Sequence, residues 1–266
     1  MALRIALLLA PLVHAHRGIS RRALAAAPAA LALPANAYNA PAFIERDLQF
    51  PTLKRTITLT QAFGAARGSV KDAPDAGDRT GTYGWPGGDS LAYYLARYPD
   101  LVKKKRVLEL GCGTGAVGIV CSFLGASKVL LTDGSPAVLE TTSINVKKNR
   151  ASRASLQRLR WGYAEDLQKA APGTWDLVVA AEVAYQRETM PAFLATIAAL
   201  LSENGRALVV MTPELADNGR GLAGIEKIMR EDVALELLSV EAPSEDDDDD
   251  ENLYTARYTL KRRAGG

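Results

Sequence analysis

The chain has 266 residues, of which 48% are hydrophobic and 23% charged, an ordinary composition for a globular protein. Its 32 basic and 30 acidic residues give a net charge of only +2, which provides no electrostatic reason to expect nucleic-acid binding. Both histidines, His14 and His16, lie near the N-terminus, so the rest of the chain offers no histidine for a catalytic triad or a metal site. Cys112 and Cys121 match no zinc spacing, and we predict no metal site.

The first 40 residues are predicted to form a targeting leader. The segment MALRIALLLAPLVHA has one arginine, an apolar run too short to span a bilayer and a small-residue end, which is typical of a secretory-type signal. The next 22 residues, HRGISRRALAAAPAALALPANA, lack acidic residues and have the composition of a transit peptide. Two targeting signals in series resemble the bipartite leaders of proteins imported into complex algal plastids. A twin-arginine signal within this leader and a single mitochondrial or plastid presequence are the alternatives.

Regular secondary-structure signals begin near Phe50. An alternating segment over 55–60 predicts an edge strand within an N-terminal extension, residues 41–79. Apolar residues from Leu91 to Tyr98 recur at helical spacing, and Asp89 or Ser90 can cap this helix. Further strands are predicted over 106–110, 128–133, 155–161, 175–182, 206–212, 233–240 and 253–260. Further helices are predicted over 116–124, from Ser135 to Asn149, near 189–202 and near 219–231.

This alternation of strands and helices predicts an α/β fold. The fold is a doubly wound, mostly parallel seven-stranded sheet with a C-terminal antiparallel hairpin, formed by a domain over residues 80–266. In such sheets ligands bind at the carboxyl ends of the strands. The segments that follow the strands ending at Leu110, Asp133 and Ala181 are therefore expected to meet at one crevice.

The glycines Gly111, Gly113 and Gly115 follow a strand and precede a helix, the context in which glycines approach a cofactor. Their spacing also satisfies the dinucleotide-binding pattern. Glu109 would repel a pyrophosphate, but it suits a ligand that carries an ammonium and a sulfonium group. Asp133, which ends the next strand, can accept hydrogen bonds from both hydroxyls of a ribose. Hydride chemistry lacks its usual groups here, because no tyrosine has a lysine four residues later.

Two stretches, VLELGCGTGAVGIV (107–120) and VLLTDGSPAVLETTSINVKKN (129–149), resemble the core of class I, seven-β-strand S-adenosylmethionine methyltransferases. Three more resemble motifs of a group of protein-lysine methyltransferases within that class. They are the Trp-Pro element of TGTYGWPGGDSLAYYL (80–95), the Trp-Gly of LRWGY (159–163) and the acidic-x-x-aromatic end of DLVVAAEVAY (176–185). The chain departs from the group at Glu182, where aspartate is more common.

The resemblance implies S-adenosylmethionine as the cofactor. The backbone of the glycine loop, at Gly111, Gly113 and Gly115, would run beside the methionine part of the cofactor. Glu109 would lie near the amino group of that part, and Asp133 would bind the ribose. The other implied cofactor contacts are Gly134 beside the adenosine, Trp161 against the adenine, Ala181 in the slot and Trp85 as a lid fixed by Pro86 and the next two glycines.

The resemblance implies a lysine side chain on a protein as the substrate, with Glu182 and Tyr185 at its point of entry. Glu182 would capture and orient the lysine ammonium, and Tyr185 would desolvate the amine. A small-molecule methyltransferase, a non-catalytic cofactor-binding domain and a dinucleotide oxidoreductase are the alternatives. The acidic run over 245–251 fits a solvated loop, or a segment that holds a basic protein substrate near the crevice.

Overall fold

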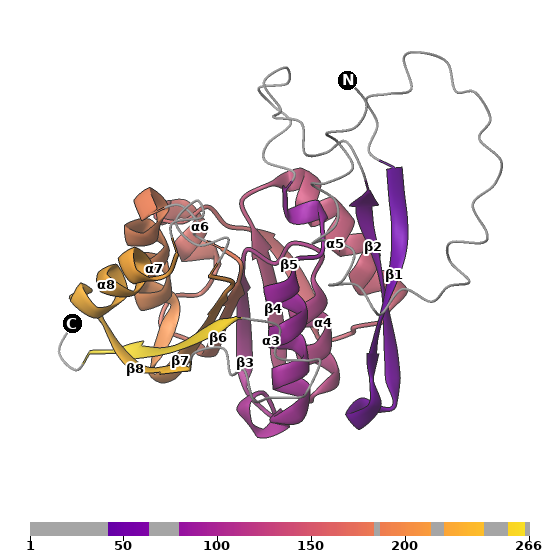
Figure 1. Ribbon diagram of the computed structural model, residues 1–266, viewed down its shortest axis with the longest axis horizontal. Coiled ribbons are helices and arrows are strands. Elements are labelled where there is room, and N and C mark those ends of the chain that lie inside the picture. The colour runs from indigo at the N-terminus through magenta and orange to yellow at the C-terminus, as the bar shows by residue number, and fades with distance from the viewer. Residues whose placement is uncertain (1–41, 64–79, 184–186, 214–220, 242–254, 264–266) are drawn as a thin grey trace, which may run out of the picture.

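The computed structural model describes residues 42–63, 80–183, 187–213, 221–241 and 255–263 (Figure 1). The predicted leader, Tyr185 and the acidic run over 245–251 lie outside these residues. Within them, no helix combines the length and the apolar character that a membrane crossing requires.

The main sheet has seven strands in the order β5-β4-β3-β6-β7-β9-β8. β9 is antiparallel to both of its neighbours, and the other neighbouring pairs are parallel. The strands are β3 (Arg106–Leu110), β4 (Lys128–Asp133), β5 (Ala154–Arg158), β6 (Trp175–Ala181), β7 (Leu201–Met211), β8 (Leu235–Glu241) and β9 (Ala256–Arg262). The predicted fold class is confirmed, including the antiparallel C-terminal strands.

Helices cover both faces of this sheet (Figure 1). They are α3 (Pro86–Arg97), α4 (Ala116–Phe123), α5 (Pro136–Lys148), α6 (Ala164–Lys169), α7 (Met190–Leu200) and α8 (Ala223–Glu231). Alternate strand residues point to opposite faces, so that Val107 packs with α3, α4 and α5, whereas Leu108 packs with α6, α7 and α8. The continuous apolar runs of the sequence therefore correspond to strands that are buried on both sides.

The N-terminal extension forms a separate two-stranded antiparallel sheet. Its strands are β1 (Ala42–Phe50) and β2 (Arg55–Phe63), joined by a short 3-10 helix over Pro51–Leu53. The strand predicted over 55–60 is part of β2, but it pairs with β1, which the sequence reasoning missed, and not with the main sheet. β1 was missed because only its end, with Leu48 and Phe50 buried, alternates clearly.

Helix α3 begins earlier than predicted. Trp85 is its N-cap residue with an extended backbone, and Pro86 occupies the first helical position, where its fixed φ favours a helix. The two glycines after Pro86, from which an extended turn that fixes Trp85 was predicted, lie instead in the first helical turn. Asp89 also lies in this turn and does not cap the helix. Tyr98 is the C-cap residue and is 46% exposed, which leaves it outside the buried face.

Helix α6 was not predicted. Its sequence, AEDLQK, is short and polar, so it has no apolar periodicity to detect. It lies in the connection between β5 and β6, which are both parallel to their neighbours in the sheet. Two parallel strands need a crossover connection, which is usually a helix, so the predicted topology already indicated a helix between β5 and β6.

Candidate cofactor and active site

A pocket of about 950 Å³ opens at the carboxyl ends of β3, β4, β5 and β6. Nine of the predicted site residues line it, although they come from five segments of the chain. These residues are Trp85, Glu109, Gly111, Gly113, Asp133, Gly134, Trp161, Ala181 and Glu182.

The glycine loop has a left-handed backbone at Gly111, Gly113 and Gly115, with φ values of +67°, +52° and +85°. A Cβ atom at Gly113 would lie 3.1 Å from the carbonyl oxygen of Gly81, so the loop passes close to a second backbone segment. Gly115 is not among the described residues that line the pocket. It is the N-cap of α4, where a Cβ atom would lie 2.7 Å from Thr142 Cγ2. Its expected contact with the cofactor is therefore not supported by its position.

Glu109 is 4% exposed and accepts a hydrogen bond from the backbone N–H of Gly118 at 2.9 Å. Burial raises the pKa of this carboxyl to about 8, the Gly118 N–H opposes the shift, and the nearby Asp133 carboxylate adds to it. A Cβ atom at position 118 would lie 2.6 Å from Glu109 Oε2, so this placement depends on a glycine that sequence reasoning did not identify. A cation bound in the pocket would favour the ionised carboxylate.

Asp133 ends β4 and is held by two backbone N–H groups. Its Oδ1 accepts a hydrogen bond from Ser135 at 2.9 Å, and its Oδ2 accepts a longer one from Gly113 at 3.4 Å. The carboxylate therefore connects the glycine loop to the start of α5. At Gly134, a Cβ atom would make only ordinary contact with Arg160 Cγ, at 3.8 Å.

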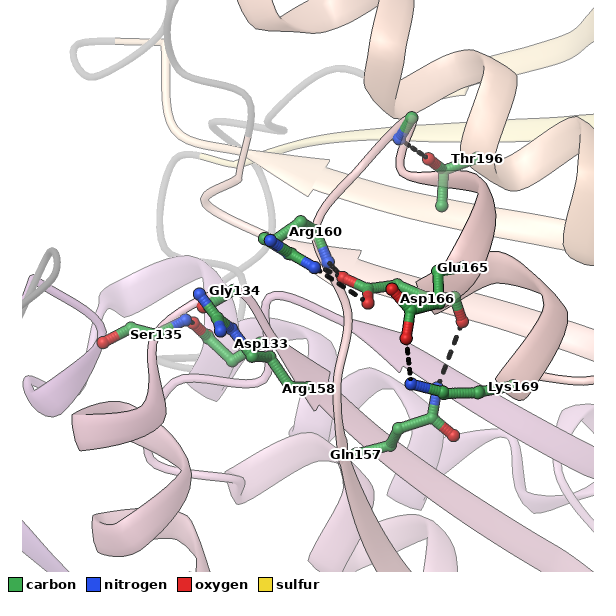
Figure 2. A network of polar contacts seen from close by, with 11 residues as sticks. Asp133, Gly134, Ser135, Gln157, Arg158, Arg160, Glu165, Asp166, Lys169 and Thr196 are labelled. Atoms are coloured by element: carbon green, nitrogen blue, oxygen red, sulfur yellow. Dashed lines mark hydrogen bonds and ion pairs between the residues drawn. The ribbon is translucent and has the colours of Figure 1, made fainter.

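Two arginines that sequence reasoning missed line the pocket next to Asp133 (Figure 2). Arg158 Nε donates to the Gly134 carbonyl at 3.0 Å. Arg160 forms a bidentate ion pair with Asp166, with Nε–Oδ2 and Nη2–Oδ1 distances of 2.8 and 3.1 Å, and this pair lowers the pKa of the Asp166 carboxyl to about 2. The available signal was their position at the carboxyl edge of the sheet, where Arg158 ends β5 and Arg160 follows it.

Two tryptophans, Trp85 and Trp161, line the pocket. The Trp161 ring packs against Phe193 of α7, with 5.0 Å between centroids and 57° between ring planes. Trp85 is 38% exposed, and its Nε1–H donates to the carbonyl of Thr80 at 3.1 Å. Both rings are oriented by contacts within the protein, which reduces the entropy cost of using them as binding surfaces.

Glu182 follows β6 and adopts a left-handed backbone with φ +53°, which is rare for a residue other than glycine. Its carboxylate accepts hydrogen bonds from the Thr212 hydroxyl and, at 3.3 Å, from the Thr212 N–H. A side chain at Gly87 would collide with the Glu182 carboxylate, so the first turn of α3 must be open at this point. Strained residues of this kind cluster at functional sites. Sequence reasoning identified Glu182, but it missed Thr212 and the close approach of Gly87 to the Glu182 carboxylate.

These residues fit a compact ligand that carries positive charge and a ribose. Glu109 and Asp133 line the same pocket, and Gly111 and Gly113, which have no side chains, line it with their backbone. The buried Glu109 carboxyl has a raised pKa, and a pyrophosphate beside it would oppose its ionisation further. Among the described residues, no group of three or more His, Cys, Asp or Glu side chains could hold a metal ion.

A family model described as lysine methyltransferase matches residues 70–218, more than half of the chain. The chain belongs to the lysine methyltransferase family. The resemblance found in the sequence motifs is thereby confirmed. Membership of this family implies S-adenosylmethionine as the cofactor and decides against the dinucleotide.

Curated members of the family match this chain over different lengths. EEF1A lysine methyltransferase 3 from Mus musculus is 31% identical over 211 residues, which cover 79% of this chain and 81% of that protein. Protein N-lysine methyltransferase METTL21A from Danio rerio is 40% identical over 122 residues, covering 44% of this chain and 54% of that protein. Calmodulin-lysine N-methyltransferase from Arabidopsis thaliana is 28% identical over 163 residues, or 59% and 52%. The chain thus spans about half the length of two of these three relatives.

Solved structures share the fold of this lysine methyltransferase family member. A putative SAM-dependent methyltransferase from Streptococcus mutans superimposes with a TM-score of 0.53 and 15% identity, covering 84% of this chain and 56% of that chain. The PH0226 protein from Pyrococcus horikoshii OT3 gives a TM-score of 0.51 and 15% identity, covering 66% of this chain and 89% of that chain. At this identity the likeness concerns the fold alone.

Proposed function

We propose that this chain transfers a methyl group from S-adenosylmethionine to a lysine side chain of a protein. Family membership supports the proposal, and so do the relatives, whose names describe lysine methyltransferases. The observation that carries it is the placement of Glu182. Glu182 lines the pocket that Glu109 and Asp133 also line, and its backbone has a strained, positive φ. Hydrogen bonds from Thr212 hold its carboxylate in place.

The cofactor, when bound, supplies an electrophilic methyl group on a sulfonium. In our proposal Glu109 faces the amino group of its methionine part, while the backbone at Gly111 and Gly113 passes beside that part. Asp133, oriented by the N–H groups of Ser135 and Gly113, accepts hydrogen bonds from the ribose hydroxyls. Trp161, braced by Phe193, flanks the adenine. Gly134 and Ala181 complete the slot.

The lysine substrate must lose a proton before it can attack. With an ordinary pKa near 10.4, only about one lysine in 2,000 is neutral at pH 7. In our proposal Glu182 binds and orients the incoming ammonium, and Tyr185, which is assigned from the sequence alone, desolvates the amine, so that the proton leaves to water. Acceleration then comes chiefly from alignment of the reacting atoms, which can contribute roughly 7–11 kcal/mol.

Transfer of radiolabelled methyl groups to an extract tests this proposal. Label in a protein band, with methyl-lysine found by mass spectrometry, supports it. Label confined to small molecules favours the small-molecule alternative, and absence of label with intact cofactor binding favours the non-catalytic alternative. Either result would refute the proposed activity.

Three variants separate the proposed roles in that assay. Asp133→Ala should abolish binding of S-adenosylhomocysteine, measured by calorimetry. Glu182→Gln should keep that binding and lose transfer. Glu231→Gln removes an exposed carboxylate at the end of α8 and serves as the control that keeps both. A Glu182→Gln variant that transfers methyl groups at the parent rate would show that Glu182 has no role in catalysis.

We further propose that residues 1–40 direct import into an organelle, a plastid in preference to a mitochondrion. The sequence features of a signal segment followed by a transit-like segment support this. Mass spectrometry of the N-terminus of the native protein tests it. A mature protein that starts near residue 40 is expected, and one that retains Met1 would refute the proposal.

A further inference from the structure

The hairpin of β1 and β2 lies before residues 70–218, the part that the family model matches. It lies beside α5 (Figure 1), whose first residues line the pocket. Asn145 bonds both backbone groups of Thr60, accepting from its N–H at 2.7 Å and donating to its carbonyl at 2.9 Å. Asn149, one helical turn later, bonds Thr58 in the same way. Asn145 also donates to the Thr114 carbonyl in the glycine loop at 2.9 Å. The position of the hairpin is thus fixed relative to that loop.

The same part of the hairpin also contacts the segment that carries Trp85, since Arg46 pairs with Leu59, between Thr58 and Thr60. Arg46 of β1 forms a bidentate ion pair with Asp89 in the first turn of α3, in which the Nη2–Oδ1 distance is 2.9 Å. The two side chains are only 14% and 16% exposed, so this pair is screened less than a surface pair. Gln61 of β2 accepts a hydrogen bond from the Gly84 N–H at 3.2 Å. A side chain at position 84 would collide with the Arg46 guanidinium.

These contacts fix residues on both sides of Trp85. Gly84 precedes it and Asp89 follows it by one helical turn, and both line the pocket, as Trp85 does. Arg46 is not among the described residues that line the pocket. Its guanidinium contacts both Gly84 and Asp89, which lie on either side of Trp85 in the chain.

We propose that Arg46, supported by Gln61, is a positioning residue that holds Trp85 in the pocket wall, so that the N-terminal hairpin contributes to cofactor affinity. The inference uses the family's cofactor and is independent of the proposed lysine substrate. It gives the hairpin a role in cofactor binding beyond burial of its own apolar residues.

Fluorine NMR of protein labelled with 5-fluorotryptophan tests the inference without any activity assay. The chain has three tryptophans, so three resonances are expected, and Trp85→Phe assigns the one that matters. In the Arg46→Gln variant we expect the Trp85 resonance to shift, while those of Trp161 and Trp175 stay in place. The Kd for S-adenosylhomocysteine should rise about tenfold, a typical size for coupling between sites. Arg46→Lys, which keeps the charge, should recover part of both effects.

Glu45→Gln is the matched control. Glu45 is the neighbouring residue on β1, and its ion pair with Lys148 of α5, at 2.5 Å, also connects the hairpin to the main domain. It contacts neither Gly84 nor Asp89 in the contacts that the structure shows, so its removal should leave the Trp85 resonance and the Kd unchanged. Equal effects of Glu45→Gln and Arg46→Gln would show that only the general stability of the hairpin matters, and would refute the inference.

A second variant tests the inference even if Arg46→Gln does not fold. Gln61→Leu removes the acceptor of the Gly84 N–H without changing charge, and it should move the same Trp85 resonance. If Arg46→Gln does not fold, Gln61→Leu decides the matter. A parental Trp85 resonance and a parental Kd in every folded variant would overturn the inference. Methyl transfer is not measured, so failure of the lysine proposal would leave this result unaffected.

Discussion

The buried carboxyl of Glu109 should make the stability of this protein depend on pH. Its pKa is raised from 4.5 to about 8, chiefly because burial disfavours the charged form. Between these two pH values the folded protein holds a proton that the unfolded chain releases. The stabilisation from this group is therefore fully present below about pH 4.5 and is lost as pH rises through about 8.

The magnitude follows from the same shift. Each pH unit in this window should lower the free energy of unfolding by about 1.4 kcal/mol, and the whole window corresponds to about 5 kcal/mol. Glu109→Gln should remove this slope, because the amide is neutral throughout and its oxygen can still accept the hydrogen bond from the Gly118 N–H. The variant should match the parent near pH 5 and exceed its stability by several kcal/mol above pH 8.

Urea denaturation of parent and variant from pH 5 to pH 8.5 measures the difference, in which the titration of all other groups cancels. Glu140→Gln removes an exposed carboxylate of α5 and measures the effect of losing one surface charge. Added S-adenosylhomocysteine should reduce the slope of the parent, since its ammonium favours the ionised carboxylate. A difference between parent and Glu109→Gln that stays constant over this range would refute the reasoning.

Three other substitutions have definite expected outcomes. Gly113→Ala should weaken S-adenosylhomocysteine binding at least about tenfold in calorimetry, because of its φ of +52° and its close approach to another backbone segment. Gly173→Ala, with φ +67° in open space, is its control and should leave binding unchanged. Asn145→Ala should cost about 3 kcal/mol in urea denaturation, since three backbone groups lose their partner; a cost below about 1 kcal/mol would contradict this. Thr212→Val should lower kcat about tenfold with unchanged cofactor affinity, because Glu182 loses its hydroxyl donor, and a parental kcat would refute that role.

The sequence by itself determined the fold class and nine of the residues that line the pocket. Apolar runs that alternate with amphipathic segments leave few arrangements other than a doubly wound sheet, because each strand must be covered on both faces. Parallel strands all end at one edge of the sheet. Glu109, Asp133 and Glu182, at or just beyond the ends of β3, β4 and β6, were therefore predictable neighbours although they are far apart in the chain.

The tertiary structure alone decided which groups support these residues. Gly118 and Gly87 matter because a carboxylate occupies the space where their side chains would be, and no local pattern reports such long-range contacts. Thr212 is 30 residues from Glu182 along the chain, and Arg46 is 43 residues from Asp89. Local propensity and periodicity describe the backbone over a few residues. A contact between distant segments depends on how the packed layers align, which becomes definite only when the whole core has formed.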